Sequence, residues 1–385
     1  MHKERRFRLS RRDFVSVLAA SGAASLVSRR LNAQEADSRA AKIVNGNMAV
    51  DMHNHVSIRM LSEGKTNPAD VPLLDVAAEM KKGGFAALCY TYPVDAIGAK
   101  AEADQYYNAH IDALNQMDEL LKRQKMRRAY NLNDIQTAHK NGEPIIIQDV
   151  EGTEFIGGHL ERVEEAYRRG VRHMQLVHFY NDPVRPLGDI QGNVPPVGGL
   201  TDFGAEVIRE CNRLHIVVDL AHGEFAMVQG AAKVAAQPFI VSHTAFDTPF
   251  ARQAVEGMKE PVSPVKRFVS AEYAKTVADA GGIVGIWHLF PTLKDYIHNI
   301  RELVDVVGVD HVGFGTDTAI ALAPGNTKSP AGSNNTNNFF PDERGGFFYA
   351  VADEMLKQGF SPEEIGKIIG GNYCRVFGEI TGNRG

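Results

Sequence analysis

Short apolar runs recur along the chain, and amphipathic segments lie between them. The runs are rich in Val, Ile, Leu and Ala on both alternating faces, which is typical of buried parallel strands. The eight candidate strands are Met48–Asp51, Phe85–Thr91, Pro144–Val150, His173–Val177, His215–Leu220, Pro238–Ser242, Gly282–Trp287 and His311–Thr316. Eight strand–helix units predict an α/β fold of the (β/α)8, or TIM, barrel type. A doubly wound open sheet is the alternative, and the lack of a G-x-G-x-x-G pattern after the first strand disfavours it.

Three segments carry local signals. The segment from Thr201 to Leu214 places its apolar side chains on one helical face, with Thr201 as the N-cap. The capping box Ser361-Pro362-Glu363-Glu364 predicts a helix that ends at Gly370-Gly371. The segment from Thr318 to Arg344 is rich in Asn, Gly, Pro and Ser and follows the eighth strand. A long irregular loop at this place is more often a lid or substrate loop than a spacer.

The first 33 residues differ from the rest of the chain. They hold eight of the 42 Lys and Arg residues and two of the 47 Asp and Glu residues, so the remainder has 34 basic and 45 acidic residues and a net charge of −11. The twin-arginine pattern Leu9-Ser10-Arg11-Arg12-Asp13-Phe14-Val15 precedes a modest apolar run that extends to Leu26. These features predict a twin-arginine signal peptide over residues 1–33 and export to the periplasm. The alternative is a basic amphipathic helix on the folded protein. Residues 34–385 are then expected to form a single catalytic barrel.

Composition excludes several classes of protein. The 44% of hydrophobic and 23% of charged residues are ordinary for a globular domain. The net charge of −5 argues against nucleic acid as the partner, because phosphate binding needs a basic surface. No other apolar run is as long as the one within residues 1–33, so no stable membrane span is expected after signal removal. Cys89, Cys211 and Cys374 lack a CxxC spacing and are interpreted as buried free thiols.

Histidines and carboxylates follow the candidate strands at the ends where a barrel carries its chemistry. The set is His53, His55, Glu151, His178, His222, His243 and Asp317. Singly, each histidine could be a hydrogen-bonded rim residue, and each carboxylate could cap a helix or turn. Together, such a buried cluster would be costly unless a cation bound there. Nitrogen and oxygen ligands suit Zn²⁺, with Mn²⁺, Fe²⁺ or Co²⁺ as alternatives.

The cluster divides into two ligand sets that share Glu151. His53, His55 and Glu151 could hold one ion, and Glu151, His222 and His243 a second. Two divalent ions would share a bridging hydroxide at neutral pH. Asp317 is then the expected general base and acid, and His178 is expected to stabilise the oxyanion.

These motifs resemble the membrane dipeptidase (renal dipeptidase) family of metallopeptidases, a branch of the amidohydrolase superfamily. The resemblance spans residues 49–379 and rests on Asp51-x-His53, Val150-Glu151-Gly152, Gly170-Val171-Arg172 through His178, Gly199-Leu200-Thr201-x-Phe203-Gly204, Val218-Asp219-Leu220-x-His222, Ser242-His243-Thr244, Gly315-Thr316-Asp317 and Gly370-Gly371-Asn372. It implies a barrel, a binuclear zinc site and hydrolysis of dipeptides, often with a D-residue at the C-terminal position. It also implies that His53, Glu151, His222 and His243 are metal ligands, that His178 contacts the scissile carbonyl and that Asp317 is the acid/base.

The chain departs from the family pattern at three places. His55 stands where the family usually has Asp, which keeps a ligand but raises the charge of the site by one. Ala319 stands where a second Asp usually follows the catalytic one. The arginine that binds the substrate carboxylate has no clear motif; Arg252 is nearest in spacing, and Arg267 is a second candidate.

Three functions are consistent with the sequence. The first is an exported metallodipeptidase with two divalent ions, a small peptide substrate and no nucleic acid partner. The sequence neither predicts nor excludes a homodimer. The second is another amidohydrolase that cleaves a lactone, lactam or N-acyl amino acid at the same site. The third is a non-catalytic metal-binding barrel, against which the presence of Asp317 and His178 argues, because neither is needed to hold a metal.

Overall fold

The barrel strands follow one another around a single parallel sheet. The structure, a computed structural model, describes residues 39–55, 75–99, 101–192, 194–256, 264–321 and 335–382. Strands pair in the order β1 (Val50–His55), β2 (Ala87–Thr91), β4 (Ile145–Glu151), β5 (Val171–Gln175), β6 (Val217–Asp219), β7 (Phe239–Thr244), β8 (Val284–Ile286) and β9 (Val312–Phe314). The short strand β3 (Arg127–Arg128) lies off this path and pairs with β4. Each of the eight predicted strands is present, which confirms the α/β barrel.

Hydrogen bonds between the first and last barrel strands bring the sheet round on itself. The amide N–H of His55 donates to the carbonyl of Thr318 at 2.7 Å, and that of Asp317 donates to the carbonyl of His53 at 3.0 Å. Beneath them, the buried Asp51 carboxylate accepts bonds from the Thr316 amide at 2.8 Å and the Thr316 hydroxyl at 2.6 Å. These bonds hold the ends of β1 and β9 together and set the spacing of the side chains that follow.

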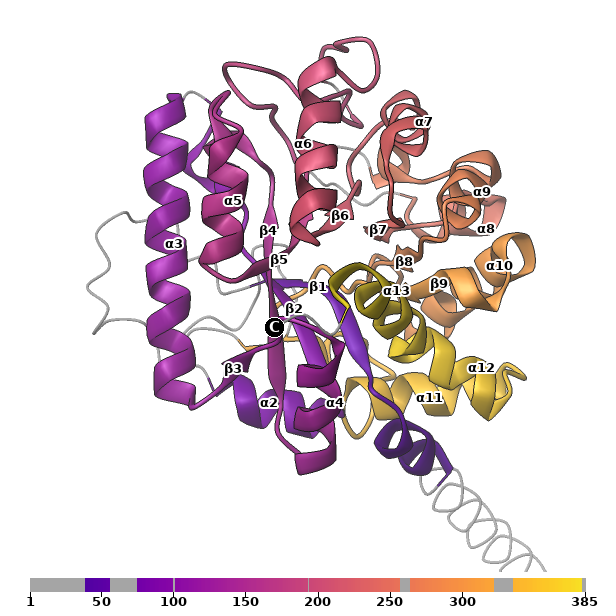
Figure 1. The fold of residues 1–385 in the computed structure, drawn as a ribbon. Helices are drawn as coiled ribbons and strands as arrows, with labels where there is room; N and C mark the ends of the chain where they lie inside the picture. The colour runs from indigo at the N-terminus through magenta and orange to yellow at the C-terminus, as the bar shows by residue number, and fades with distance from the viewer. Residues whose placement is uncertain are drawn as a thin grey trace, which may run out of the picture.

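Helices surround the sheet (Figure 1). They are α2 (Val76–Gly83), α3 (Ala103–Gln124), α4 (Leu132–Asn141), α5 (Glu161–Arg168), α6 (Asp202–Leu214), α7 (Phe225–Val234), α8 (Pro249–Ala254), α9 (Ala271–Asp279), α10 (Leu293–Val307), α11 (Phe347–Lys357), α12 (Pro362–Gly366) and α13 (Asn372–Thr381). The side chain of Thr201 accepts a hydrogen bond from the Gly204 amide, which confirms the predicted N-cap of α6. No helix among the described residues is long and apolar enough to cross a membrane. All three cysteines are buried and free.

The helix predicted to end at Gly370-Gly371 does end there. The capping box at Ser361 is present and opens α12, which runs on through η8 (Lys367–Gly371). Gly370 has non-helical backbone angles, so the path kinks at this residue before α13 begins at Asn372. A Cβ at Gly370 would lie 2.0 Å from the carbonyl oxygen of Met48, so the glycine also permits close contact with the segment before β1.

The segment predicted as a lid is anchored at its C-terminal part. Residues 322–334 lie outside the described part of the chain. After them, Asn337 donates to the backbone carbonyl and the carboxylate of Glu79 on α2, both at 2.8 Å. The hydroxyls of Thr318 and Thr336 lie 2.7 Å apart in the buried network that joins β9 to β1. Residues 335–338 are therefore part of the packed barrel wall.

Candidate metal centre

Five imidazoles from the ends of four strands converge on the Glu151 carboxylate. Its Oε1 lies 3.3 Å from Nε2 of His178 and 3.5 Å from Nε2 of His53. The same oxygen lies 3.9 Å from Nε2 of both His222 and His243. Oε2 lies 3.8 Å from Nε2 of His55. Glu151 is only 1% exposed, so the carboxylate forms the centre of a buried ring of imidazoles.

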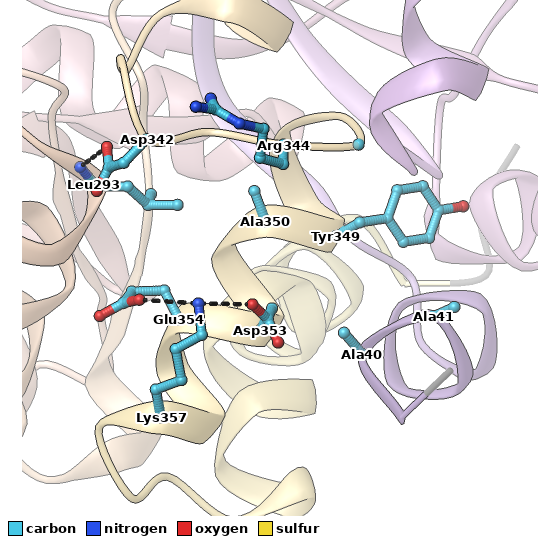
Figure 2. Close-up of a pocket in the computed structure, with 11 residues that line it drawn as sticks. Ala40, Ala41, Leu293, Asp342, Arg344, Tyr349, Ala350, Asp353, Glu354 and Lys357 are labelled. Carbon is cyan, nitrogen blue, oxygen red and sulfur yellow. Dashed lines mark hydrogen bonds and ion pairs between the residues drawn. The ribbon is translucent and has the colours of Figure 1, made fainter. Parts of the chain in front are cut away.

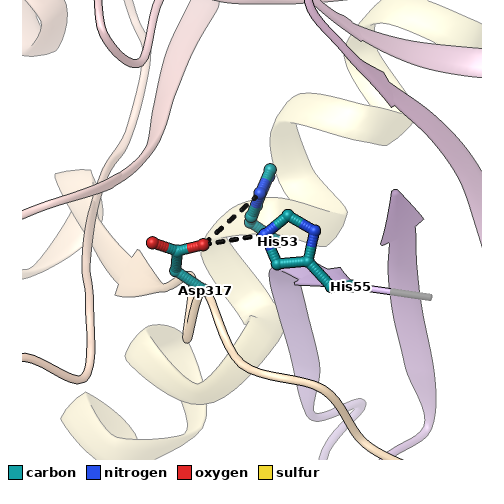
Figure 3. A group of neighbouring side chains, drawn as sticks. All are labelled: His53, His55 and Asp317. Carbon is teal, nitrogen blue, oxygen red and sulfur yellow. Dashed lines mark hydrogen bonds and ion pairs between the residues drawn. The ribbon is translucent and has the colours of Figure 1, made fainter. Parts of the chain in front are cut away.

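Three overlapping groups in this cluster have the spacing of metal ligands. Their ligand atoms all lie within 4.8 Å of one another, and the groups are His53, His55 and Asp317 (Figure 3), His53, Glu151 and His243, and Glu151, His178 and His222. The predicted set of Glu151, His222 and His243 also lies together, because Nε2 of His222 is 3.1 Å from Nε2 of His243 and both are 3.9 Å from Oε1 of Glu151. The other predicted set differs at His55, whose Nε2 lies closer to Asp317, at 2.9 Å, than to Glu151, at 3.8 Å.

Two of these side chains come from residues with unusual backbone conformation. His222 has φ 66° and Asp317 has φ 53°, in the left-handed region that non-glycine residues rarely adopt. Each follows the end of a barrel strand. Such conformations cost free energy and are found where the surrounding structure holds a side chain in a functional position. The turn after β6 therefore directs His222 toward Glu151, and the turn after β9 directs Asp317 toward His55.

The residues fit a divalent cation. His53 Nδ1 and Nε2, His55 Nδ1 and Glu151 Oε2 are buried without a hydrogen-bond partner. Burial lowers the pKa of His53, but the carboxylates of Glu151, Asp149 and Asp317 raise it to about 9, so this position favours a positive charge. Burial holds the pKa of both His222 and His243 well below the usual value. Arg267 lowers the pKa of His222 further, and His53 lowers that of His243 further. Neutral imidazoles are the form that binds metal.

Asp317 directs its carboxyl group at the imidazoles. Its Oδ1 lies 2.9 Å from Nε2 of His55 and 4.0 Å from Nε2 of His53 (Figure 3). Burial would raise the pKa of this carboxyl, but the imidazoles of His243, His55 and His53 hold it well below its usual range. The cluster therefore favours the carboxylate form of Asp317.

His178 is held by a residue that the sequence analysis missed. Asp95 Oδ1 lies 2.8 Å from His178 Nδ1, and its Oδ2 accepts the Phe179 amide at 3.0 Å. Burial lowers the pKa of His178, but Asp95 and Glu151 raise it above the usual value. Asp95 lies on η3 (Val94–Ile97), after β2, where no motif identified it. Its position leaves Nε2 of His178 directed at Glu151.

The structure places Arg267, and not Arg252, beside the cluster. Arg252 on α8 forms an ion pair with Asp247 at 2.5 Å, and its side chain is 54% exposed. Arg267 on η5 (Pro264–Arg267) donates to Nε2 of His222, and its guanidinium lies 4.1 Å above the Trp287 ring. The first choice for the substrate carboxylate is therefore corrected. Spacing from His243 could not distinguish the two arginines, because a helix and residues 257–263 intervene.

A pocket of about 430 Å³ lies elsewhere, against α11 (Figure 2). Lys357 there pairs with Asp353 at 2.7 Å and with Glu354 at 3.4 Å. Asp342 accepts the Leu293 amide at the start of α10. Arg344 donates to the backbone carbonyls of Pro341 and Glu343, and no predicted site residue lines the pocket. The metal-binding cluster is therefore the candidate site.

A parallel barrel with a buried carboxylate and imidazoles at its strand ends defines a metal-dependent hydrolase. Residues 37–384 match the model of the membrane dipeptidase family, peptidase family M19, and the chain belongs to this family of metallopeptidases. It is 24% identical over 335 residues to dipeptidase tcpJ of Claviceps purpurea, covering 86% of this chain and 70% of that protein.

Solved structures show the same fold. The probable dipeptidase PvdM from Pseudomonas aeruginosa superposes with a TM-score of 0.71 at 16% identity, over 90% of this chain and 99% of that one. A metallopeptidase from Rhodobacter sphaeroides, solved with a phosphinate mimic of the dipeptide L-Ala-D-Ala, gives a TM-score of 0.65 at 18% identity, over 86% of this chain and 99% of that one.

Proposed function

We propose that the protein is an exported dipeptidase that uses two divalent ions, Zn²⁺ first among them, bridged by Glu151. The observation that carries the proposal is the position of the Glu151 carboxylate, whose two oxygens lie 3.3 to 3.9 Å from five imidazole nitrogens. His53, His55, His222 and His243 would complete the coordination. When bound, two such ions supply a hydroxide nucleophile at neutral pH and polarise the scissile carbonyl.

The remaining groups then have distinct tasks. The ionised Asp317 carboxylate takes the proton from the attacking water and returns it to the leaving amine. His178 Nε2 donates to the oxygen of the scissile carbonyl as negative charge develops on it, and Asp95 fixes the ring through Nδ1. The pKa of His178 is raised by Asp95 and Glu151 despite burial, which favours the donor form. The family and the dipeptide mimic bound by the Rhodobacter relative support a peptide bond as the target.

Two walls of the site suit the two parts of a dipeptide. Arg267 offers a cation beside His222 for the substrate carboxylate. The Phe179 ring packs 4.0 Å from the His178 ring and 5.5 Å from the His222 ring while 39% of the residue stays exposed. An aromatic face at this position favours substrates with an apolar side chain.

Replacement of Arg267 by Gln is expected to raise KM for a dipeptide about 10–100-fold, the usual effect of losing a hydrogen bond to a charged group. The reduction in kcat should be smaller, because the carboxylate is bound in both the ground and transition states. Steady-state kinetics and metal analysis of the same samples check this. Arg252→Gln is the matched control and should leave KM within about two-fold. Equal effects of the two variants on KM would show that a group other than Arg267 binds the substrate carboxylate.

The substrate class is tested with fully metallated protein. A panel of L,L- and L,D-dipeptides, N-acyl amino acids and lactones is assayed for initial rate at equal concentration. The proposal requires the highest kcat/KM for a dipeptide. A preference for lactones or N-acyl amino acids would identify another amidohydrolase activity at the same site.

Export is part of the proposal and rests on the pattern around Arg11 and Arg12, which lies outside the described residues. Replacing both by Lys is expected to leave the protein in the cytoplasm, because the twin-arginine route requires the pair. Cell fractionation followed by immunoblotting measures the distribution. Arrival of the double variant in the periplasm would show that residues 1–33 act as a general secretory signal.

A further inference from the structure

A second layer of ionisable side chains lies inside the barrel, behind the metal-binding cluster. Asp149 on β4, His173 on β5 and Asp219 on β6 are each 0% exposed. Asp149 precedes Glu151 by two residues, so alternation along the strand places both side chains on the inner face of the barrel. The roles proposed above for dipeptide hydrolysis do not use any of these three residues.

Asp149 faces the rear of one expected metal ligand. His53 directs Nε2 toward Glu151 at 3.5 Å, and its Nδ1 lies 3.6 Å from Oδ2 of Asp149. Neither His53 Nδ1 nor either oxygen of Asp149 has a hydrogen-bond partner, although all are buried. A histidine that binds metal through Nε2 carries its hydrogen on Nδ1, and that hydrogen is normally donated to a carboxylate, a carbonyl or water. Asp149 offers such an acceptor.

His173 lies on the far side of Asp149. Its Nε2 is 4.0 Å from Oδ1 of Asp149 and 3.2 Å from Oδ2 of Asp219. Asp219 is itself fixed, since its Oδ1 accepts the amides of Ala221 at 2.9 Å and Ser242 at 3.0 Å. The bond to Asp219 fixes the His173 ring, so Asp149 lies between this ring and that of His53.

The geometry of this layer defines a role for Asp149. We propose that Asp149 is a positioning residue that accepts the Nδ1 hydrogen of His53 and so orients the ring for metal binding through Nε2. The proposal rests on the two-metal site of the proposed function, but not on the identity of the substrate.

Asp149→Asn removes the negative charge of the Asp149 carboxylate with little change in the shape of the side chain. Zn²⁺ affinity is measured by competition with a chromophoric chelator, and the Co²⁺ absorption spectrum reports the ligand geometry. The ion that His53 binds should be held about 10–100-fold more weakly, the usual effect of removing such a partner. The second ion should be affected less. The melting temperature of the metal-free protein should change little, because His173 keeps its bond to Asp219. If Asp149→Asn does not fold, the smaller Asp149→Ser is measured in the same way.

Glu154→Gln is the matched control. Glu154 is also a fully buried carboxyl whose two oxygens have no hydrogen-bond partner, but it lies after β4 on η4 (Glu154–Ile156) and not on a barrel strand. Both metal affinities of this variant should stay within about three-fold of wild type. Unchanged Zn²⁺ affinity and an unchanged Co²⁺ spectrum in the Asp149 variant would overturn the proposal. Because no substrate is used, absence of dipeptide hydrolysis in the wild type would refute the proposed function and leave this result interpretable.

Discussion

Asp317→Asn is expected to lower kcat about 10²–10⁴-fold while two ions stay bound, because general acid–base help is usually worth that much. The carboxylate is ionised by the surrounding imidazoles and lies 2.9 Å from His55. Asparagine keeps the shape of the side chain but cannot take up a proton at neutral pH. KM should move little, since the residue acts mainly in the transition state. Stopped-time assays over a range of dipeptide concentrations, with metal analysis of the same samples, measure both quantities.

Two outcomes would contradict this role for Asp317. Activity within a few-fold of wild type would leave the residue as a turn cap after β9, a role that asparagine fills nearly as well. Loss of one ion in the variant would make Asp317 a metal ligand, which its grouping with His53 and His55 allows geometrically. In either case, the proton-transfer step would have to be reassigned.

Glu151→Ala should release both ions and lower activity by at least about 10⁴-fold, because the metal supplies both the nucleophile and the polarised carbonyl. The carboxylate is the one group within 4 Å of all five imidazoles among the described residues. Elemental analysis after dialysis gives the metal content per chain. Glu154→Gln is the matched control, since this carboxyl is also fully buried near the site but has no hydrogen-bond partner.

The control should keep both ions. Retention of one ion in Glu151→Ala would show that Glu151 serves a single metal and would remove the bridging arrangement. A metal content of one ion per chain in the wild type would contradict the bridging arrangement more directly. Circular dichroism of both variants separates loss of metal from loss of fold.

The sequence predicted the barrel and most of the cluster because both follow from local patterns. Buried parallel strands are nearly continuous apolar runs, and the polar residue that ends such a run is visible without a structure. The placement of His53, Glu151 and His243 followed from these two signals. The place of His55 beside Asp317 did not, because the distance between side chains of different strands depends on strand register and on the closure of β1 against β9.

Residues that act through another residue were harder to find. Asp95 follows β2 on a short 3₁₀ turn, and Arg267 follows a segment with no regular pattern. The position of Asp149 could have been predicted from the sequence, since alternation along the strand places it on the same inner face as Glu151. His173 begins the predicted fourth strand, so it was not among the residues that follow the strand ends. Its importance depends on Asp149 and Asp219, which come from neighbouring strands.

Activity as a function of bound metal tests the central claim most directly. Metal-free protein is titrated with Zn²⁺, and the initial rate of L-Ala-D-Ala hydrolysis is measured after each addition. The account predicts that hydrolysis requires metal and that the rate reaches its maximum at two ions per chain. Hydrolysis by the metal-free protein, a maximum at one ion, or no dipeptide hydrolysis at any metal content would contradict it.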